Sequence, residues 1–148
     1  MKKKIPILVS ACLLGTPCRY DGASKPCPSV LALQETYELL PVCPEVMGGL
    51  PTPRTPSEII GSRVVMKSGR DVTENYRRGA EEALRIAREN NCTLAILKEK
   101  SPSCGSGAIY DGSFSGTLTH GDGGAAALLK AHGIRVVGES EITNDILK

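Results

Sequence analysis

Residues 93–104, TLAILKEKSPSC, predict both the kind of fold and the place of a functional site. The first five residues are a short, continuous apolar run, which is typical of a strand buried on both faces of a parallel sheet. The chain then becomes polar and carries Cys104 into a loop of serine, proline and glycine. Free cysteines usually pack in the core of a protein. Cys104 is therefore a candidate for a chemical role.

Similar apolar runs recur along the chain and alternate with helical patterns. Further strands are expected at four places: 5–11, 37–42, 62–67 and 133–137. Helices are expected at three: 29–35, 71–91 and 122–133. The helix at 71–91 has Asp71 or Thr73 as its expected N-terminal cap. This alternation predicts an α/β fold, a three-layer sandwich with a mainly parallel sheet of the Rossmann-like or flavodoxin-like kind, in a single domain over residues 1–148.

The composition favours a small molecule as the partner. The formal net charge is only +2, and the chain has one Phe, four Tyr and no Trp. A charge this small does not indicate binding to nucleic acid or to an anionic membrane, and few aromatic rings are present to stack on bases. No oligomeric state is predicted.

The first fifteen residues, MKKKIPILVSACLLG, imitate a bacterial lipoprotein signal peptide. The apolar part before Cys12 is short and contains Pro6, and apolar residues continue after the cysteine. We interpret this segment as the first buried strand, and we expect a cytoplasmic protein.

Three of the six cysteines follow predicted strands. Cys12 follows the first strand, Cys43 the second, and Cys104 the strand at 93–97. Parallel strands end at the same edge of a sheet, where open α/β folds bind their ligands, so these thiols are expected to converge. Cys92 precedes the strand at 93–97 and is expected at the opposite edge, as a packing residue.

The remaining cysteines and the glycines leave several alternatives. Cys27 has no obvious partner, and Cys18 lies close enough in sequence to fold back to Cys12. Convergent thiols in a reducing compartment favour zinc or an iron-sulfur cluster over a disulfide framework. The segment CGSGAIYDGSFSG, 104–116, can turn several backbone N–H groups toward one anionic centre, which favours the cluster. The same glycines could equally make ordinary turns.

Five segments together resemble the thiouracil desulfidase family, which was long known only as a domain of unknown function. The segments are LVSACLLGTPCRYDG, PVCPEVMGGLPTPRTPSEI, GRDVTENYRRGAEEAL, AILKEKSPSCGSGAIYDGSFSG and HGDGGAAALLKAHGIRVVGESE. The resemblance implies a [4Fe-4S] cluster held by Cys12, Cys43 and Cys104, with one iron left without a protein ligand. It also implies catalytic roles for Glu45 and Ser101.

Three further residues are weaker candidates. Ser103 is expected to contact the cluster or the substrate, and Cys18 is kept as a reserve ligand. Arg54, in GGLPTPRTP, is a candidate for orienting a pyrimidine carbonyl; the alternative is a solvated side chain.

The resemblance implies an enzyme that hydrolyses a thiocarbonyl such as 2-thiouracil to uracil without net electron transfer. The open iron would take the sulfide. Two alternatives remain at this point: an enzyme that hands the sulfur to an acceptor, and a non-catalytic module for redox sensing or sulfur carriage. In the second, Cys18 would be a fourth ligand that closes the cluster.

Overall fold

The computed structural model describes residues 4–142, and its centre is a parallel sheet of four strands in the order β2-β1-β5-β8. The strands are β1 (Ile5–Ser10), β2 (Tyr37–Val42), β5 (Leu94–Leu97) and β8 (Arg135–Gly138). All four coincide with predicted apolar runs, with ends that differ by two residues at most. The predicted α/β fold with a mainly parallel sheet is confirmed.

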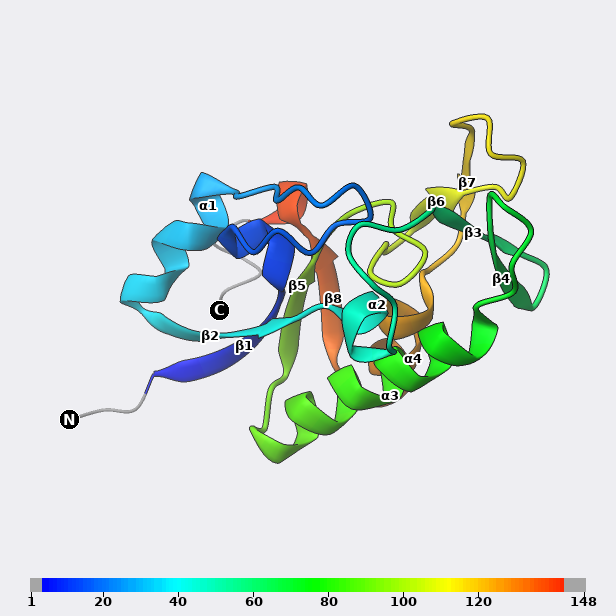
Figure 1. Cartoon of the computed structure of the whole chain (residues 1–148). Helices are drawn as coiled ribbons and strands as arrows, with labels where there is room; N and C mark the ends of the chain where they lie inside the picture. Colours follow the sequence, from blue (N-terminus) through cyan, green and yellow to red (C-terminus); the bar gives the residue numbers. More distant parts are fainter. Residues whose placement is uncertain (1–3, 143–148) are drawn as a thin grey trace.

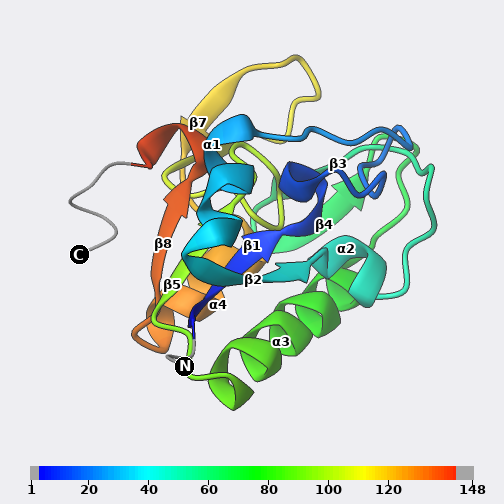
Figure 2. The same ribbon diagram turned by 90° about the vertical axis from the view of Figure 1, so that its left-hand side faces the viewer.

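Helices cover both faces of the sheet and make it the middle of three layers. On one face lie α1 (Pro28–Leu31) and the 3₁₀ helix η2 (Ala32–Glu35); on the other lie α3 (Thr73–Glu89) and α4 (Gly124–Ala131). Figure 2 shows α1 and α3 on opposite sides of the strands. Side chains of β1 alternate between the layers, since Ile7 and Val9 pack with Val30 of α1 while Leu8 packs with Ala83 of α3.

The strand order creates a crevice beside β1. The chain runs from β1 to β2 at one side and then returns to place β5 on the other side. In doubly wound sheets, ligands bind at the carboxyl ends of the strands next to such a reversal. The segments that leave β1 and β5 there are the 3₁₀ helix η1 (Ala11–Leu14) and the loop 98–107.

The chain also forms two antiparallel hairpins, each a two-stranded sheet separate from the main one. They are formed by β3 (Ser57–Ile60) with β4 (Arg63–Met66), and by β6 (Ala108–Tyr110) with β7 (Leu118–His120). Figure 1 shows both at the right of the molecule, beyond α2 (Pro44–Met47). The predicted strand at 62–67 therefore exists as β4, but it belongs to a hairpin and not to the main sheet. Gly61, with φ of +63°, makes the tight turn that pairs it with β3.

The expected N-terminal cap of α3 is wrong. Val72, and neither Asp71 nor Thr73, occupies the N-cap position, and its own side chain makes no capping hydrogen bond. The Asp71 carboxylate instead accepts the Thr73 N–H at 2.9 Å and pairs with Arg63 of β4. The carboxylate therefore ties the helix start to the hairpin. A last 3₁₀ helix, η3 (Glu139–Glu141), follows β8. Among residues 4–142, no helix combines the length and the apolar character that crossing a membrane requires.

Two glycines let α2 approach α3 closely. A Cβ atom on Gly79 of α3 would lie 1.8 Å from the Pro44 carbonyl oxygen, and one on Gly48 would lie 1.9 Å from the Asn75 carbonyl oxygen. The Asn75 amide also donates a hydrogen bond to the Gly48 carbonyl at 2.9 Å. Backbone packs directly on backbone here, so the position of α3 determines where α2 lies.

Candidate active site

A cavity of about 560 Å³ lies at the carboxyl ends of β1, β2 and β5. Its walls come from η1, the start of α2, the loop after β5 and the two hairpins. Every site residue predicted from the sequence lines it: Cys12, Cys43, Glu45, Arg54, Ser101, Ser103 and Cys104. Cys18, the reserve ligand, lines it too. The structure thus brings all eight predicted side chains to one place.

Three of the thiols form a contiguous group. The Cys18 side chain hydrogen-bonds with those of Cys12 and Cys43, and the Cys43 thiol also lies 3.8 Å from the Cys18 carbonyl oxygen. The bond with Cys12, together with burial, raises the pKa of Cys18, against an opposing effect of Cys43. The bond with Cys18 and burial raise the pKa of Cys43. The Cys18 and Cys43 thiols are therefore harder to ionise here than a cysteine thiol in water.

Cys104 lines the same cavity where it meets the apolar core, and Cys43 is near enough to affect its ionisation. Burial raises the pKa of the Cys104 thiol to about 12, although the hydroxyls of Ser10 and Ser103 act in the opposite direction. Ser103 Oγ lies 3.6 Å from the Cys104 sulfur. A metal centre bound here would have to displace the thiol proton.

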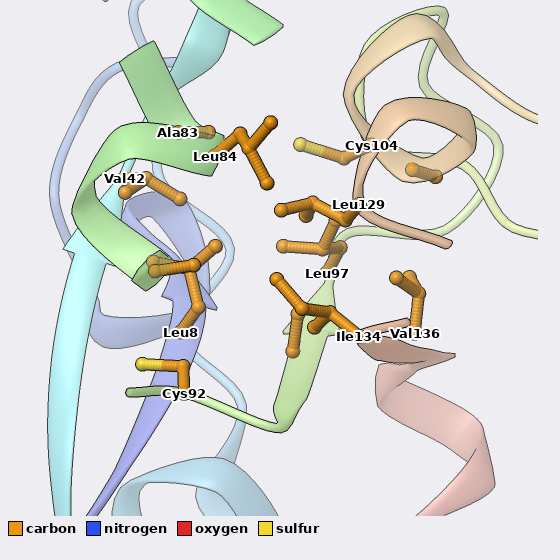
Figure 3. Close-up of a cluster of buried hydrophobic side chains, with 13 residues drawn as sticks. Leu8, Val42, Ala83, Leu84, Cys92, Leu97, Cys104, Leu129, Ile134 and Val136 are labelled. Atoms are coloured by element: carbon orange, nitrogen blue, oxygen red, sulfur yellow. The ribbon is translucent and has the colours of Figure 1, made fainter. Parts of the chain in front are cut away.

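The other two cysteines do not line the cavity. Cys92 lies at the opposite end of the same apolar cluster as Cys104, as Figure 3 shows. Cys27 precedes α1 and packs on the cluster of the other face. The predicted packing role of Cys92 at the far edge of the sheet agrees with this position.

The two oxygens of Glu45 have different partners. Oε1 accepts a hydrogen bond from Arg54 Nε at 3.1 Å, and Arg54 Nη2 lies at the same distance. Oε2 accepts from Ser103 Oγ at 3.0 Å and lies 3.4 Å from Ser101 Oγ. One oxygen is thus held by a cation, and the other faces two hydroxyl groups.

Ser101 is positioned by the backbone of its own loop. Its Oγ accepts the N–H groups of Ser103 and Cys104, each at 3.1 Å. The same oxygen lies 2.9 Å from Ser103 Oγ. Because two donors point at this oxygen, negative charge on it is stabilised, and its proton is directed toward Ser103 or Glu45.

Arg54 is buried, with 3% of its side chain exposed, and each guanidinium nitrogen has a protein acceptor. Besides its contacts with Glu45, Nη1 donates to the Pro51 carbonyl and to Thr52 Oγ1, and Nη2 donates to the Cys18 carbonyl. We expected this side chain to orient a substrate carbonyl. In the structure it joins the segment of Cys18 to the segment of Glu45.

Sequence reasoning missed several residues of the cavity. Tyr76 lies on the buried face of α3, and its hydroxyl hydrogen-bonds with Ser57 and Glu45. Burial and the nearby Glu45 carboxylate raise the pKa of Tyr76. The signal was present, because a buried tyrosine hydroxyl requires a polar partner. Glu58 and Phe114, from the two hairpins, gave no signal, because only the folded chain brings them to the cavity.

The lining suits an iron-sulfur cluster in two respects. Thiols from η1, from the residue before α2 and from the loop after β5 line the cavity, and thiolates are the usual protein ligands of such clusters. Further basic side chains on the same walls can balance the negative charge of a thiolate-bound centre, among them Arg19, Lys25, Lys67 and Lys100. Within residues 4–142, no three His, Cys, Asp or Glu side chains converge on the position of a single metal ion.

Comparisons with known proteins agree with one another. Residues 7–141 match the 2-thiouracil desulfurase family. The uncharacterised protein YbbK of Bacillus subtilis (strain 168) is 48% identical over 151 residues, which cover 95% of this chain and 99% of YbbK. A solved structure of the [4Fe-4S]-dependent thiouracil desulfidase TudS is 49% identical, with a TM-score of 0.90; the match covers 99% of this chain and 96% of that one.

Proposed function

The chain belongs to the 2-thiouracil desulfurase family, and from this premise we propose that it is a [4Fe-4S]-dependent desulfidase acting on 2-thiouracil or a similar thiolated pyrimidine. The observation that carries the proposal is the cavity itself. Thiols from three segments and the Glu45 carboxylate with its serine partners line the same space. The reaction replaces the sulfur of a thiocarbonyl by oxygen from water, so it requires no net electron transfer.

We assign Cys12, Cys43 and Cys104 as the cluster ligands. Each follows a strand of the main sheet and lines the cavity, which supports the assignment. Once bound, a cluster with three protein ligands supplies an iron with a free position, which acts as a Lewis acid toward a thiocarbonyl sulfur. Cys12 and Cys104 come from the two sides of the crevice beside β1.

Glu45 and Ser101 handle protons in this proposal. The hydrolysis needs a base that takes a proton from water and an acid that returns one. Glu45 Oε2 is the oxygen suited to this exchange, because Oε1 is held by Arg54. Ser101 and Ser103 connect that oxygen to the loop of Cys104 through hydroxyl contacts of 2.9–3.4 Å.

Arg54 then acts as a positioning residue. Its guanidinium fixes Glu45 Oε1 and the Cys18 carbonyl at once, so it holds the proton-transferring carboxylate at a set place beside the thiols. An ion pair this well buried also keeps water from the back of the carboxylate.

The contacts of Cys18 support a second candidate function. Because its thiol touches both Cys12 and Cys43, it could supply a fourth ligand and close the cluster, as a redox-sensing module would require. The variant Cys18→Ser separates the two. A desulfidase with three ligands retains its iron and its turnover in this variant, whereas a module with four ligands loses iron.

The decisive experiment is an activity assay on protein reconstituted without oxygen. Iron and acid-labile sulfide would be measured first, followed by uracil and sulfide released from 2-thiouracil. We expect about four irons per chain and equal amounts of the two products over many turnovers. A loaded protein that releases neither product would refute the desulfidase, and zinc in place of iron would refute the cofactor.

We also propose that the protein works in the cytoplasm. The six cysteines are unpaired, and in the cavity the Cys18 thiol contacts those of Cys12 and Cys43. A reducing compartment preserves such thiols for a cluster.

A further inference from the structure

The few aromatic residues of this chain are concentrated at the cavity. It has four Tyr and one Phe, and four of these five side chains line the cavity: Tyr20, Tyr76, Tyr110 and Phe114. Tyr76 is already engaged with Glu45 by its hydroxyl. Phe114 is half-buried, lines the cavity and has no polar group on its side chain, so an apolar ring is all that this side chain can offer a ligand.

Phe114 has a backbone conformation that a phenylalanine rarely adopts. Its φ is +56°, in the left-handed region, which costs a non-glycine residue roughly 1–2 kcal/mol. The neighbouring Gly112 and Gly116 also have positive φ, of +94° and +80°. Glycine would fit this turn without cost at position 114 as well. A bulky residue kept there against its own preference points to a use for the side chain.

A buried carboxylate from the other hairpin holds this turn in place. Glu58 of β3 is 8% exposed, and its Oε1 accepts the N–H groups of Gly112 at 2.9 Å and of Phe114 at 3.2 Å. Gly112 also lies against β3, because a Cβ atom there would be 2.8 Å from the Ile59 carbonyl oxygen. The two hairpins are thus locked together, and Phe114 is fixed relative to the cavity.

From these contacts we propose that Phe114 stacks on the planar ring of the substrate and that Glu58 is its positioning residue. This inference rests on the proposed function, and it deepens that function by naming the residue that selects a flat heterocycle. Base–aromatic stacking depends on the π-face of the ring and not on its hydrogen-bonding groups. Phe114 therefore selects planarity and affects binding, while Glu45 and Ser101 carry the chemistry.

The test compares Phe114→Leu, which keeps an apolar side chain without a ring, with Phe114→Tyr, which keeps the ring. We expect Phe114→Leu to raise KM for 2-thiouracil about 10-fold with kcat within about 2-fold. Phe114→Tyr should behave like the unchanged protein. Calorimetric titration with uracil, the product, should give the same 10-fold weakening without relying on turnover.

A saturated analogue isolates the stacking contribution. In 5,6-dihydro-2-thiouracil the ring is not planar, so the unchanged enzyme should prefer 2-thiouracil by kcat/KM, and Phe114→Leu should reduce that preference. Leu118→Ala is the matched control, since Leu118 is an exposed apolar residue of β7 outside the cavity wall. It should change neither KM nor the preference.

Glu58 is tested by two variants. Glu58→Gln keeps the oxygen that accepts the two N–H groups and should retain a nearly unchanged KM, whereas Glu58→Val should raise KM as Phe114→Leu does, at constant kcat. Two results would overturn the inference, provided that the protein without substitutions is active. One is that Phe114→Leu leaves KM and uracil binding as they were. The other is that Phe114→Tyr is as impaired as Phe114→Leu. Failure of the unchanged, loaded protein to act on 2-thiouracil would instead overturn the proposed function.

Discussion

The two ends of β5 show how one apolar cluster can hold a packing cysteine and a candidate ligand. Cys92 and Cys104 are both buried, and both belong to the cluster between the sheet and α3 and α4 (Figure 3). Near Cys104 lie the hydroxyls of Ser10 and Ser103 and the Glu45 carboxylate. Around Cys92, burial dominates and raises the pKa of the thiol. Burial therefore does not separate the two roles, but the end of the strand at which the thiol lies does.

The largest difference between Cys104 and Cys92 should appear when each thiol is removed in turn. We expect Cys104→Ser to lose most of its iron after anaerobic reconstitution and to lose turnover altogether, because a serine hydroxyl is a poor substitute for a thiolate at an iron. Iron content and visible absorbance provide the measurement. Cys92→Ser is the matched control and should load iron normally. Equal loading of both variants would contradict the assignment of Cys104.

Replacing Glu45 by Gln tests proton transfer beside Cys104 and leaves all the proposed cluster ligands in place. Gln keeps the shape of the side chain but cannot take up a proton, so we expect kcat to fall by about 10²–10⁴ with iron content unchanged. Uracil formation under saturating 2-thiouracil is the measurement. Glu82→Gln, on the exposed face of α3, serves as the control. Turnover that survives in Glu45→Gln would assign the proton transfer to another group.

Replacing Gly79 of α3 by alanine tests whether close packing of α3 on α2 holds Cys43 and Glu45 at the cavity. Alanine in place of glycine normally stabilises a helix by up to about 1 kcal/mol. At Gly79 we expect the opposite sign, a loss of about 1–3 kcal/mol, because the new Cβ would overlap the Pro44 carbonyl and displace α2. Urea unfolding measures the change, and iron loading should fall with it, since Cys43 and Glu45 flank Pro44.

The matched control for Gly79→Ala is Gly124→Ala at the start of α4, where a Cβ atom would meet nothing within 4 Å. This variant should be neutral or slightly stabilised. Equal stability of the two variants would show that α2 can move away from α3 without cost.

The smallest expected effect is that of Cys92→Ala on the free energy of unfolding. Loss of one buried sulfur from the cluster should cost about 1 kcal/mol of unfolding free energy. Iron content and kcat should not change, which thermal unfolding and the uracil assay would check together. A loss of activity beyond the loss of folded protein would mean that the two ends of β5 are coupled.

The sequence was sufficient for the parts of the fold that depend on local pattern. The main strands are continuous apolar runs, and α3 carries its apolar residues at helical spacing. The convergence of Cys12, Cys43 and Cys104 followed from their positions after parallel strands. Their roles as ligands, and those of Glu45 and Ser101 in catalysis, stay predictions.

Features that depend on contacts between distant segments were not predictable from local pattern. Asp71 looked like a helix cap, but a neighbouring hairpin supplies an arginine for its carboxylate. Arg54 looked free to meet a substrate, yet the fold surrounds it with acceptors from three segments. Glu58 and Phe114 are 56 residues apart, and only the packing of two hairpins joins them.

The uneven distribution of aromatic rings gives the protein an internal optical reporter. There is no tryptophan, and three of the four tyrosines line the cavity. Ultraviolet emission from the folded chain therefore originates largely from side chains on the cavity wall. Arrival of a strongly absorbing cluster, or of a heterocycle, should quench that emission, so filling of the cavity can be followed in real time without attaching a dye.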